Sequence, residues 1–369
     1  MSKIVDIHTH VYPPAYVELL KSRTTVPYIR VFPPSPTARL IILPGEDDAS
    51  TPSTSRGRPL GAEYFDISLK ISFMDTHGIG ISVISLANPW LDFLPPSEAA
   101  EAAAAINDDI DAMCNSYPGR LYAFATLPVS AGQEACVAEV RRLAGMRWVR
   151  GVVLGTGGMG SGMDDPRLDD VYTALGEMDL PVFLHPHYGL PAEAYGPRAD
   201  EYGHVLPLAM GFPMETTISV ARMLLSSVFD RHTQLTLLLA HSGGTLPFLA
   251  GRLESCILHD AHLQGTGKLR NRRDVWDVLK TNILLDAVVY SALGLRAAAE
   301  ASGADRVLFG TDHPFFPPLT NEDEEDGGGE PQWLSVTTNY AAIDAAFAGD
   351  KAKSAAVLGG NAVRLLKLA

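Results

Sequence analysis

Length, composition and charge narrow the function before any motif is considered. The chain has 369 residues, of which 46% are hydrophobic, and a formal net charge of −14 at pH 7. This acidic balance argues against binding to nucleic acid or to an anionic membrane, because both need a basic face. The longest apolar runs are strand-sized, as at Leu235 to Ala240, so no membrane span is expected.

Cysteine usage indicates a reducing compartment. Cys114, Cys136 and Cys256 are widely spaced and lie in helix-like stretches. An odd count without paired spacing predicts free thiols. The first apolar strand begins almost at the initiator methionine, which leaves no room for a secretory signal. We therefore expect a cytoplasmic protein.

The first predicted strand carries two histidines. It runs from Ile4 to His10, and in a strand successive side chains alternate faces, so His8 and His10 point the same way. Two neutral imidazoles at one strand end suit a zinc-like divalent ion. A half-buried strand with two polar tips would give the same pattern. The residues at the other strand ends are therefore needed to distinguish a metal site from such a strand.

A long insertion follows a short helix at 13–22. Residues 26–62 are rich in Pro, Ser, Thr, Gly and Arg, with one short apolar piece from Leu40 to Leu43. Segments of this length without helices or strands are usually functional or mobile. Arg58 in this insertion is a candidate contact for an anionic substrate; a solvated surface arginine is the other interpretation.

From residue 63 onward, helix-like and strand-like segments alternate without a break. Helices are expected at 63–77, 97–117 with Ser97 as N-cap, 134–144, 165–178, 215–229, 246–262, from about 274, at 293–301 and beyond 336. Strands are expected at 81–88, 121–127, 149–154, 182–184, 235–240, 283–286 and 307–312.

With the strand at 4–10, this pattern predicts an α/β fold, a parallel (β/α)₈ barrel in one domain over residues 1–369. Parallel strands covered on both faces read as near-continuous apolar runs, as these do. A doubly wound open sheet is the main rival. Metal-type residues on the first and last strands favour closure, because closure makes those two strands neighbours.

Polar side chains stand where the predicted strands end. In such barrels the chemistry lies at the carboxyl ends of the strands, and packing alone does not explain polar residues at so many of them. The pattern therefore predicts a metal site assembled from several strand ends. The residues concerned are His8, His10, Asn88, His185, His241, Asp286 and Asp312.

Two further motifs are given structural interpretations. The glycine-rich turn from Gly155 to Gly160 follows a strand, but it lacks the lysine of a phosphate-binding loop and the spacing of a dinucleotide site. We interpret it as a flexible βα loop. The acidic run from Asn321 to Asp326 is interpreted as a solvated loop after the last strand.

The strand-end motifs resemble the amidohydrolase superfamily, through His8-Thr9-His10, His185, His241 and Asp312. Segments 240–244 and 309–314 are similar to its decarboxylase branch, which includes aminocarboxymuconate-semialdehyde and γ-resorcylate decarboxylases. Segments 85–90, 185–191 and 311–316 are similar to the fungal isoorotate (uracil-5-carboxylate) decarboxylases of thymidine salvage.

This resemblance implies one divalent metal ion, zinc with manganese as the alternative. The implied ligands are His8, His10, His185 and Asp312. Asp312 would also transfer the proton, and His241 would lie beside the metal as acid, base or orienting group. The bridging carbamylated lysine of two-metal relatives is missing, because no lysine ends a predicted strand.

The resemblance also implies a small carboxylate substrate and a homodimer or dimer of dimers. Asn88 would hydrogen-bond a uracil edge. Phe315 would pack on the ring, with ordinary core packing as the other interpretation. Arg252 resembles an arginine that relatives send across the dimer interface; pairing with Glu254 or Glu215 of its own subunit is the alternative.

Three classes of function follow from the sequence. A non-oxidative decarboxylase that converts isoorotate to uracil and CO₂ is favoured, with a γ-resorcylate-type aromatic acid decarboxylase as the nearest alternative. A metal-dependent hydrolase of a lactone or cyclic amide would use the same ligands. A non-catalytic barrel that has lost its metal is disfavoured by the intact ligand set.

Overall fold

The predicted barrel is confirmed in the computed structural model, which describes residues 3–266, 272–318 and 333–369. Eight strands form one sheet, and the strands that pair along it are parallel. Their spatial order is β1 (Ile4–Val11), β5 (Ile79–Leu86), β6 (Leu121–Thr126), β7 (Val149–Gly155), β8 (Val182–His185), β9 (Leu237–Leu239), β10 (Ile283–Asp286) and β11 (Val307–Leu308).

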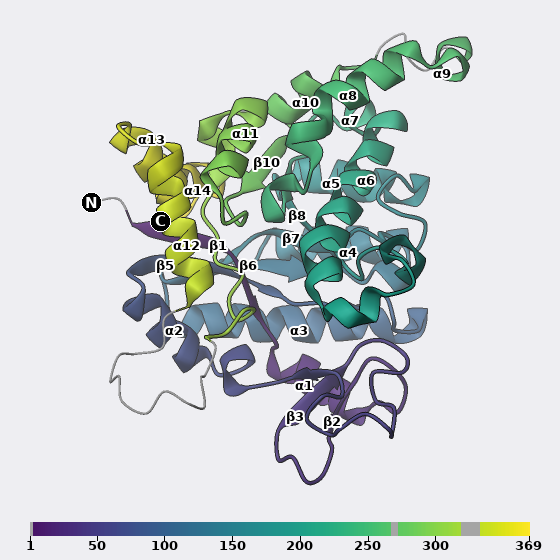
Figure 1. The fold of residues 1–369 in the computed structure, drawn as a ribbon, viewed down its shortest axis with the longest axis vertical. Coiled ribbons are helices and arrows are strands. Elements are labelled where there is room, and N and C mark those ends of the chain that lie inside the picture. The colour runs from purple at the N-terminus through teal and green to yellow at the C-terminus, as the bar shows by residue number, and fades with distance from the viewer. Residues whose placement is uncertain (1–2, 267–271, 319–332) are drawn as a thin grey trace.

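Helices surround this sheet (Figure 1). They are α1 (Pro14–Ser22), α2 (Ile67–Thr76), α3 (Pro96–Ser116), α4 (Gln133–Leu143), α5 (Asp169–Glu177), α6 (Phe212–Leu225), α7 (Val228–Arg231), α8 (Leu246–His259), α9 (Ala261–Gly265), α10 (Val275–Thr281), α11 (Ala292–Ser302), α12 (Leu334–Ala346), α13 (Lys351–Ala355) and α14 (Asn361–Leu365). Every residue of β6, β8, β9 and β10 is buried, as expected for strands covered on both faces.

The first and last strands meet and close the barrel. The backbone N–H of Ile7 donates to the carbonyl of Phe309 at 3.0 Å, and that of His10 donates to His313 at 2.8 Å. A Cβ at Gly310 would lie 2.6 Å from the Cβ of His8, so only glycine allows this close approach. This seam brings residues from the two ends of the chain into one site.

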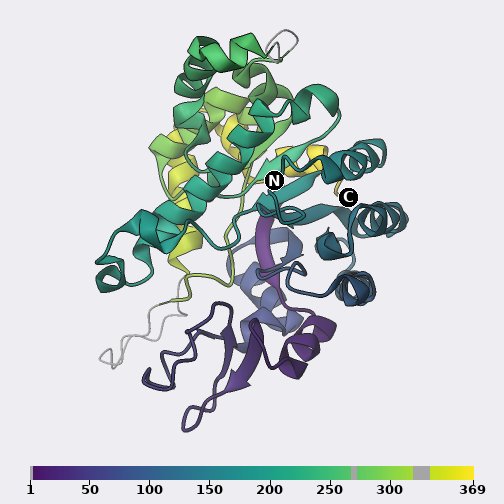
Figure 2. The same cartoon turned by 90° about the vertical axis from the view of Figure 1, so that its right-hand side faces the viewer.

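The insertion contains a small sheet of its own, which the sequence analysis did not predict. Strands β2 (Tyr28–Val31), β3 (Ala38–Ile41) and β4 (Arg58–Pro59) pair antiparallel. Leu40, in the apolar piece noted above, is a buried residue of β3. Figure 2 shows this sheet projecting from one end of the barrel. Arg58 lies on its last strand, β4.

Two local predictions are wrong. Helix α3 begins at Pro96 with Pro95 at the N-cap, not with Ser97, because proline presets the backbone of a first helical turn. The last strand ends at Leu308, and Asp312 lies in the turn that follows, with φ of 61°. The acidic run Asn321 to Asp326 lies outside the described residues.

The three cysteines are free thiols, as predicted. Across the described ranges, no helix combines the length and the apolar character that a membrane crossing requires.

Candidate metal centre and active site

Three histidines and one carboxylate converge at the carboxyl ends of the barrel strands. One ligand atom from each of His8, His10, His185 and Asp312 lies within 4.8 Å of the others, and all four residues are buried. They come from β1, from the end of β8 and from the turn after β11. The structure therefore brings together the four residues that the resemblance implied as ligands.

Each of the three histidines turns its Nε2 toward the cluster, because its Nδ1 is held from behind. His8 Nδ1 lies 2.6 Å from Asp286 Oδ2. His10 Nδ1 lies 3.1 Å from Ser85 Oγ. His185 Nδ1 donates to the carbonyl of the next residue at 2.8 Å. Metal-binding histidines are usually oriented by such partners.

The three Nε2 atoms are buried and have no hydrogen-bond partner within the described residues. Buried polar atoms rarely stay unpaired in folded proteins. Three imidazole nitrogens with one carboxylate form a donor set that suits zinc and related divalent metals. Such a set leaves room for water or substrate, as a catalytic site requires. The cluster therefore fits a divalent metal ion.

Buried carboxylates control the electrostatics of the cluster. Burial lowers the pKa of His8, but Asp312 and Asp286 outweigh it and raise that pKa to about 10. Burial lowers the pKa of His10 to about 4 and holds the pKa of His185 well below its usual range. Burial alone would raise the pKa of Asp312, yet the histidines, His8 foremost, hold it well below its usual range. Asp312 is thus ionised, and His10 and His185 are neutral, as metal ligands must be.

Asp286, the last residue of β10, organises the neighbouring strand end. Its carboxylate accepts the backbone N–H groups of His241 at 2.9 Å and Ser242 at 2.7 Å. These bonds hold His241 at φ of 54°, which is uncommon for a residue with a side chain. The turn places His241 Nε2 at 3.7 Å from Asp312 Oδ2. The sequence marked Asp286 as a polar strand end but gave no hint of this role.

A buried lysine supports the cluster from behind, and the sequence analysis missed it. Lys70 Nζ lies 2.5 Å from both Thr9 Oγ1 and His313 Nδ1. Thr9 separates the two histidines of β1, and His313 directly follows the carboxylate of the cluster. Lys70 therefore links the first strand to the turn after the last one. A signal was present, because Lys70 precedes the buried residues Phe73 and Met74 by three and four positions.

The structure also brings together Arg58, Asn88 and Phe315. The Arg58 guanidinium lies 4.7 Å from the centre of the Phe315 ring, and Nη2 lies 3.4 Å from the Asn88 carbonyl and bonds the Tyr12 hydroxyl. Phe315 packs edge-on against His10, with ring centres 5.4 Å apart. Arg58 is half-buried, and its Nε finds no partner in the described part of the chain. It is not a solvated surface arginine.

Asn88 and His187 connect the cluster to the opposite side of the barrel mouth. The Asn88 amide donates to the backbone carbonyl of His187 at 3.0 Å, which engages one of its two N–H groups. The His187 ring stacks on Tyr188, with ring centres 3.8 Å apart, and its Nε2 lies 3.6 Å from Asp92. His187 thus lies outside the ligand set, although it is only two residues from His185.

Arg252 is not brought to the site of its own chain. It lies on α8 with an exposed side chain. The alternative pairing within the subunit is not observed either. Glu254 accepts from Arg272 at 2.5 Å, and Glu215 accepts from Thr156 and from two backbone N–H groups. Among the described residues, Arg252 forms no hydrogen bond or ion pair.

Fold and site together define a barrel enzyme with a cluster suited to a divalent metal at the carboxyl ends of its strands. Comparison with known protein families agrees with this assignment. The family described as Amidohydrolase matches residues 5–368 of the chain. The chain belongs to the amidohydrolase family.

Individual relatives are similar over most of the chain. The solved structure of Metarhizium anisopliae IDCase in apo form is 53% identical and has a TM-score of 0.93, covering 99% of this chain and 97% of that one. Gamma-resorcylate decarboxylase of Rhizobium sp. is 28% identical over 254 residues, 67% of this chain and 76% of its own length. The 2-amino-3-carboxymuconate-6-semialdehyde decarboxylase of Dictyostelium discoideum is 26% identical over 259 residues, 70% of this chain and 69% of its own length.

Proposed function

We propose that this protein is a metal-dependent, non-oxidative decarboxylase that converts isoorotate to uracil and CO₂. The observation that carries the proposal is the set of three partnerless Nε2 atoms facing Asp312 among the described residues. It occurs in a chain that is 53% identical to IDCase, an isoorotate decarboxylase, over nearly its whole length. The more distant relatives reported above are named as decarboxylases too.

The reaction needs a proton at the carbon that loses CO₂. Direct loss of CO₂ from an sp² ring carbon would leave an electron pair in an sp² orbital. His8, His10, His185 and Asp312 would hold a divalent metal, which would supply Lewis-acid polarisation of the bound substrate. The protein's side chains then have to deliver a proton to C5.

Asp312 is the side chain that we assign to this proton transfer. Its proton adds to C5, the bond between C5 and the carboxylate breaks, and that electron pair restores the C5–C6 double bond as CO₂ leaves. Because the histidines lower the pKa of Asp312, a proton has to reach this residue in every cycle. His241, with Nε2 3.7 Å from Asp312 Oδ2, is placed to supply it.

Three further side chains would bind the ring. Arg58 carries a positive charge beside Phe315 and has an Nε without a partner in the described chain, so it suits an anionic substrate. Phe315 offers an aromatic edge next to His10 for packing on the pyrimidine. Asn88 keeps one amide N–H for a polar ring edge, because only the other donates to His187.

We infer that the metal is zinc. Three imidazoles favour zinc, whereas manganese prefers oxygen-rich sites. The described residues contain one group of potential ligands of this kind, which supports one metal per chain. Elemental analysis of protein produced with zinc or with manganese, together with the activity of each form, decides between the two ions.

We infer a homodimer, alone or paired into a dimer of dimers, with α8 in the interface. Phe248 and Leu258 on this helix are 86% and 51% exposed, and Ile218 on the adjacent α6 is exposed as well. Exposed apolar side chains of this size on two neighbouring helices support an interaction surface there. A two-fold arrangement would cover this face and carry each Arg252 toward the partner's site. Sedimentation of the purified protein measures the assembly.

We also propose a cytoplasmic location and a role in pyrimidine (thymidine) salvage. Free thiols at all three cysteines support a reducing compartment. Fractionation of the source cells tests the location, and accumulation of isoorotate in cells without the protein tests the role.

A substrate panel tests the chemistry. The purified protein is offered isoorotate, γ-resorcylate, and a cyclic amide and a lactone without carboxylate. CO₂ and uracil in equal amounts from isoorotate are the expected result. CO₂ from the hydroxybenzoate alone would replace the pyrimidine assignment by a γ-resorcylate type. A ring-opened product without CO₂ would identify a hydrolase.

A further inference from the structure

Tyr12 follows the strand that carries two of the proposed metal ligands. β1 ends one residue earlier, and Tyr12 comes after His8 and His10 at intervals of two residues. Side chains two positions apart lie on the same side of an extended chain, so the sequence spacing places Tyr12 in one row with these two histidines. Its side chain is fully buried, and the chemistry proposed above makes no use of it.

The Tyr12 hydroxyl joins two of the residues proposed to bind the substrate. It donates to the backbone carbonyl of Asn88 at 2.7 Å and accepts a hydrogen bond from Nη2 of Arg58. The same Nη2 lies 3.4 Å from the Asn88 carbonyl. A hydroxyl has one proton to donate and lone pairs to accept, so both bonds form at once. Because the proton of Tyr12 is bonded to a backbone carbonyl, the hydroxyl orients its neighbours and is not placed to protonate a substrate.

Three aromatic rings surround the guanidinium of Arg58. Its Cζ lies 4.7 Å from the ring centre of Phe315, 5.6 Å from that of Tyr64 and 5.9 Å from that of Tyr12. The two tyrosine rings stack with centres 5.5 Å apart, and Tyr64 meets Phe315 edge-on at 5.7 Å. Arginine is attracted to aromatic faces, and Phe315 also packs against His10 of the metal cluster. The rings therefore hold the positive charge next to that cluster.

The strand that carries Arg58 has little structure of its own. β4 has two residues and lies at the edge of the insertion sheet. The side chain is fixed by contacts with residues of the barrel, namely the hydroxyl and ring of Tyr12 after β1 and the ring of Phe315 after β11. The position of the guanidinium thus depends on Tyr12 as well as on its own strand.

The positive charge of Arg58 has no carboxylate partner in the described part of the chain. Its hydrogen bonds there start from Nη2 alone and end on a hydroxyl and a carbonyl, which are both uncharged. The side chain is half-buried, and charges removed from water are normally paired. The N–H groups of Nη1 are therefore available for a charge-assisted hydrogen bond to an anion.

We propose that Tyr12 is a positioning residue that fixes Arg58 beside the metal cluster and thereby makes the site selective for rings that carry a carboxylate. This inference rests on the proposed function. The hydroxyl holds Nη2, and Nη1 is left to bond the anionic substrate. Without the hydroxyl, the guanidinium loses a fixed orientation and binds the anion less tightly. A neutral ring makes no use of the charge, so its affinity does not depend on Tyr12.

Matched removal of two hydroxyls tests the proposal. Tyr12→Phe keeps the ring and removes the group that contacts Arg58. Tyr16→Phe is the control, because its ring is equally buried and stacks on that of Tyr12 with centres 5.4 Å apart, but its hydroxyl donates to the carbonyl of Pro89. In metal-loaded, full-length protein, Tyr12→Phe is expected to raise KM for isoorotate about tenfold and to change kcat less than about twofold. The control is expected to leave both constants unchanged.

Inhibition by uracil, the same ring without the carboxylate, separates positioning from a general structural role. Tyr12→Phe is expected to keep the uracil inhibition constant, the bound metal and the melting temperature of the wild-type protein. An unchanged KM for isoorotate in Tyr12→Phe overturns the proposal. Equal losses for isoorotate and uracil, or loss of bound metal or of the folded state, would show a structural role of the hydroxyl and would overturn it too.

A double-mutant cycle shows whether Tyr12 acts through Arg58. Arg58→Gln removes the charge and is expected to raise KM for isoorotate more than Tyr12→Phe does. Adding Tyr12→Phe to Arg58→Gln is expected to raise KM no further, because residues in contact that act as a unit are not additive. Effects that multiply in the double variant would show that the hydroxyl acts independently of Arg58 and would refute the proposal.

CO₂ release from isoorotate by the wild-type protein distinguishes this inference from the proposed function. Turnover by the wild-type protein together with a normal KM in Tyr12→Phe refutes the positioning role alone. Absence of turnover in the wild-type protein refutes the proposed function, and the role of Tyr12 in selectivity with it.

Discussion

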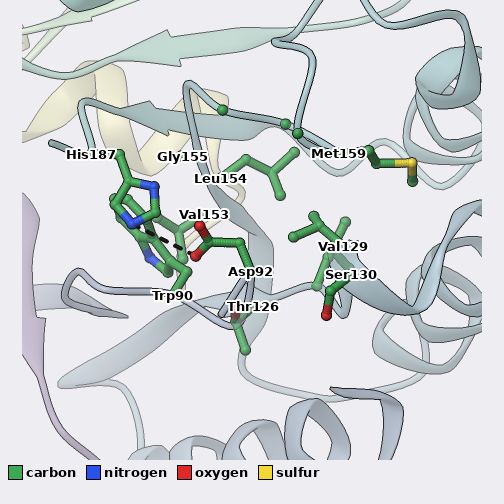
Figure 3. Close-up of a pocket in the computed structure, with 14 residues that line it drawn as sticks. Trp90, Asp92, Thr126, Val129, Ser130, Val153, Leu154, Gly155, Met159 and His187 are labelled. Carbon is green, nitrogen blue, oxygen red and sulfur yellow. Dashed lines mark ion pairs between the residues drawn. The ribbon is translucent and has the colours of Figure 1, made fainter. Parts of the chain in front are cut away.

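The two halves of the barrel mouth differ in how their polar groups are satisfied. At the ends of β1, β8, β9 and β11, buried histidines and carboxylates contact one another, and three Nε2 atoms are left facing Asp312 within the described chain. At the ends of β5, β6 and β7, mostly apolar side chains surround a cavity of about 180 Å³ that one carboxylate, Asp92, also lines (Figure 3). On the proposed function the first half holds the metal beside the reacting carbon, and none of the four proposed ligands comes from the second half. Equivalent strand-end positions thus differ in chemistry according to the side chains that each strand places there.

The largest effect is expected from two histidines that are two residues apart but lie in different halves. His185→Ala removes a proposed ligand, so bound metal falls and turnover drops by about a thousandfold or more. His187→Ala is the matched control and should retain the metal. Elemental analysis and CO₂ release measure both variants. Full metal content with normal turnover in His185→Ala would remove His185 from the ligand set.

A second prediction tests whether the active site needs Arg252 of a partner subunit in addition to the proposed metal ligands of its own chain. Arg252→Ala should remain dimeric and metal-replete but lose about a hundredfold in activity, because a charge-assisted contact to the substrate carboxylate is lost. Mixing it with inactive Asp312→Asn protein under subunit exchange should restore part of the activity. Heterodimers would then have one site with both residues intact. No recovery despite demonstrated exchange would exclude action across the interface.

A third prediction concerns Lys70, which supports the cluster of proposed metal ligands from behind. Lys70→Met keeps the aliphatic stem but removes the ammonium that contacts Thr9 and His313. Loss of such a supporting contact is expected to weaken metal affinity about 10- to 100-fold. Lys70→Arg keeps the charge and should recover part of that affinity. Competition with a metal chelator measures the affinities, and an unchanged value in Lys70→Met would show that the lysine only fills space.

The smallest effect is expected at Asn88, which joins the two halves through the His187 carbonyl. Asn88→Ala should leave the metal content unchanged and cost the transition state roughly 0.5–1.5 kcal/mol, since one hydrogen bond to a neutral group is lost. The ratio kcat/KM for isoorotate measures this cost. An unchanged ratio would exclude Asn88 from substrate recognition.

The sequence reveals the barrel and the position of the metal cluster because both depend on local patterns. Buried parallel strands read as apolar runs, and the residue that ends each run is visible in the chain, as with His185 and Asp286. The helical spacing of Lys70 indicates that it faces inward, but not which groups it contacts. Its burial depends on the seam between β1 and the turn after β11, which forms only when the barrel closes.

Other features required partners that are distant in the chain. In the small sheet of the insertion, the strand formed by Arg58 and Pro59 pairs with β3. A strand of two residues is too short to show a periodic pattern in the sequence. The glycine-rich turn reads as a flexible loop, but in the folded chain Gly155 makes room for Trp90. The exclusion of Ser97 as a cap was accessible from sequence, because Pro96 occupies the preferred first helical position.

The seam between the first and last strands also sets the order of events during biosynthesis. Thr9 and His313, which pair across it, are 304 positions apart. A ribosome exposes the two histidines of β1 early, long before it has made the carboxylate that completes the cluster. On the proposed function, a complete metal site therefore forms only after Asp312, near the end of the chain, has been synthesised.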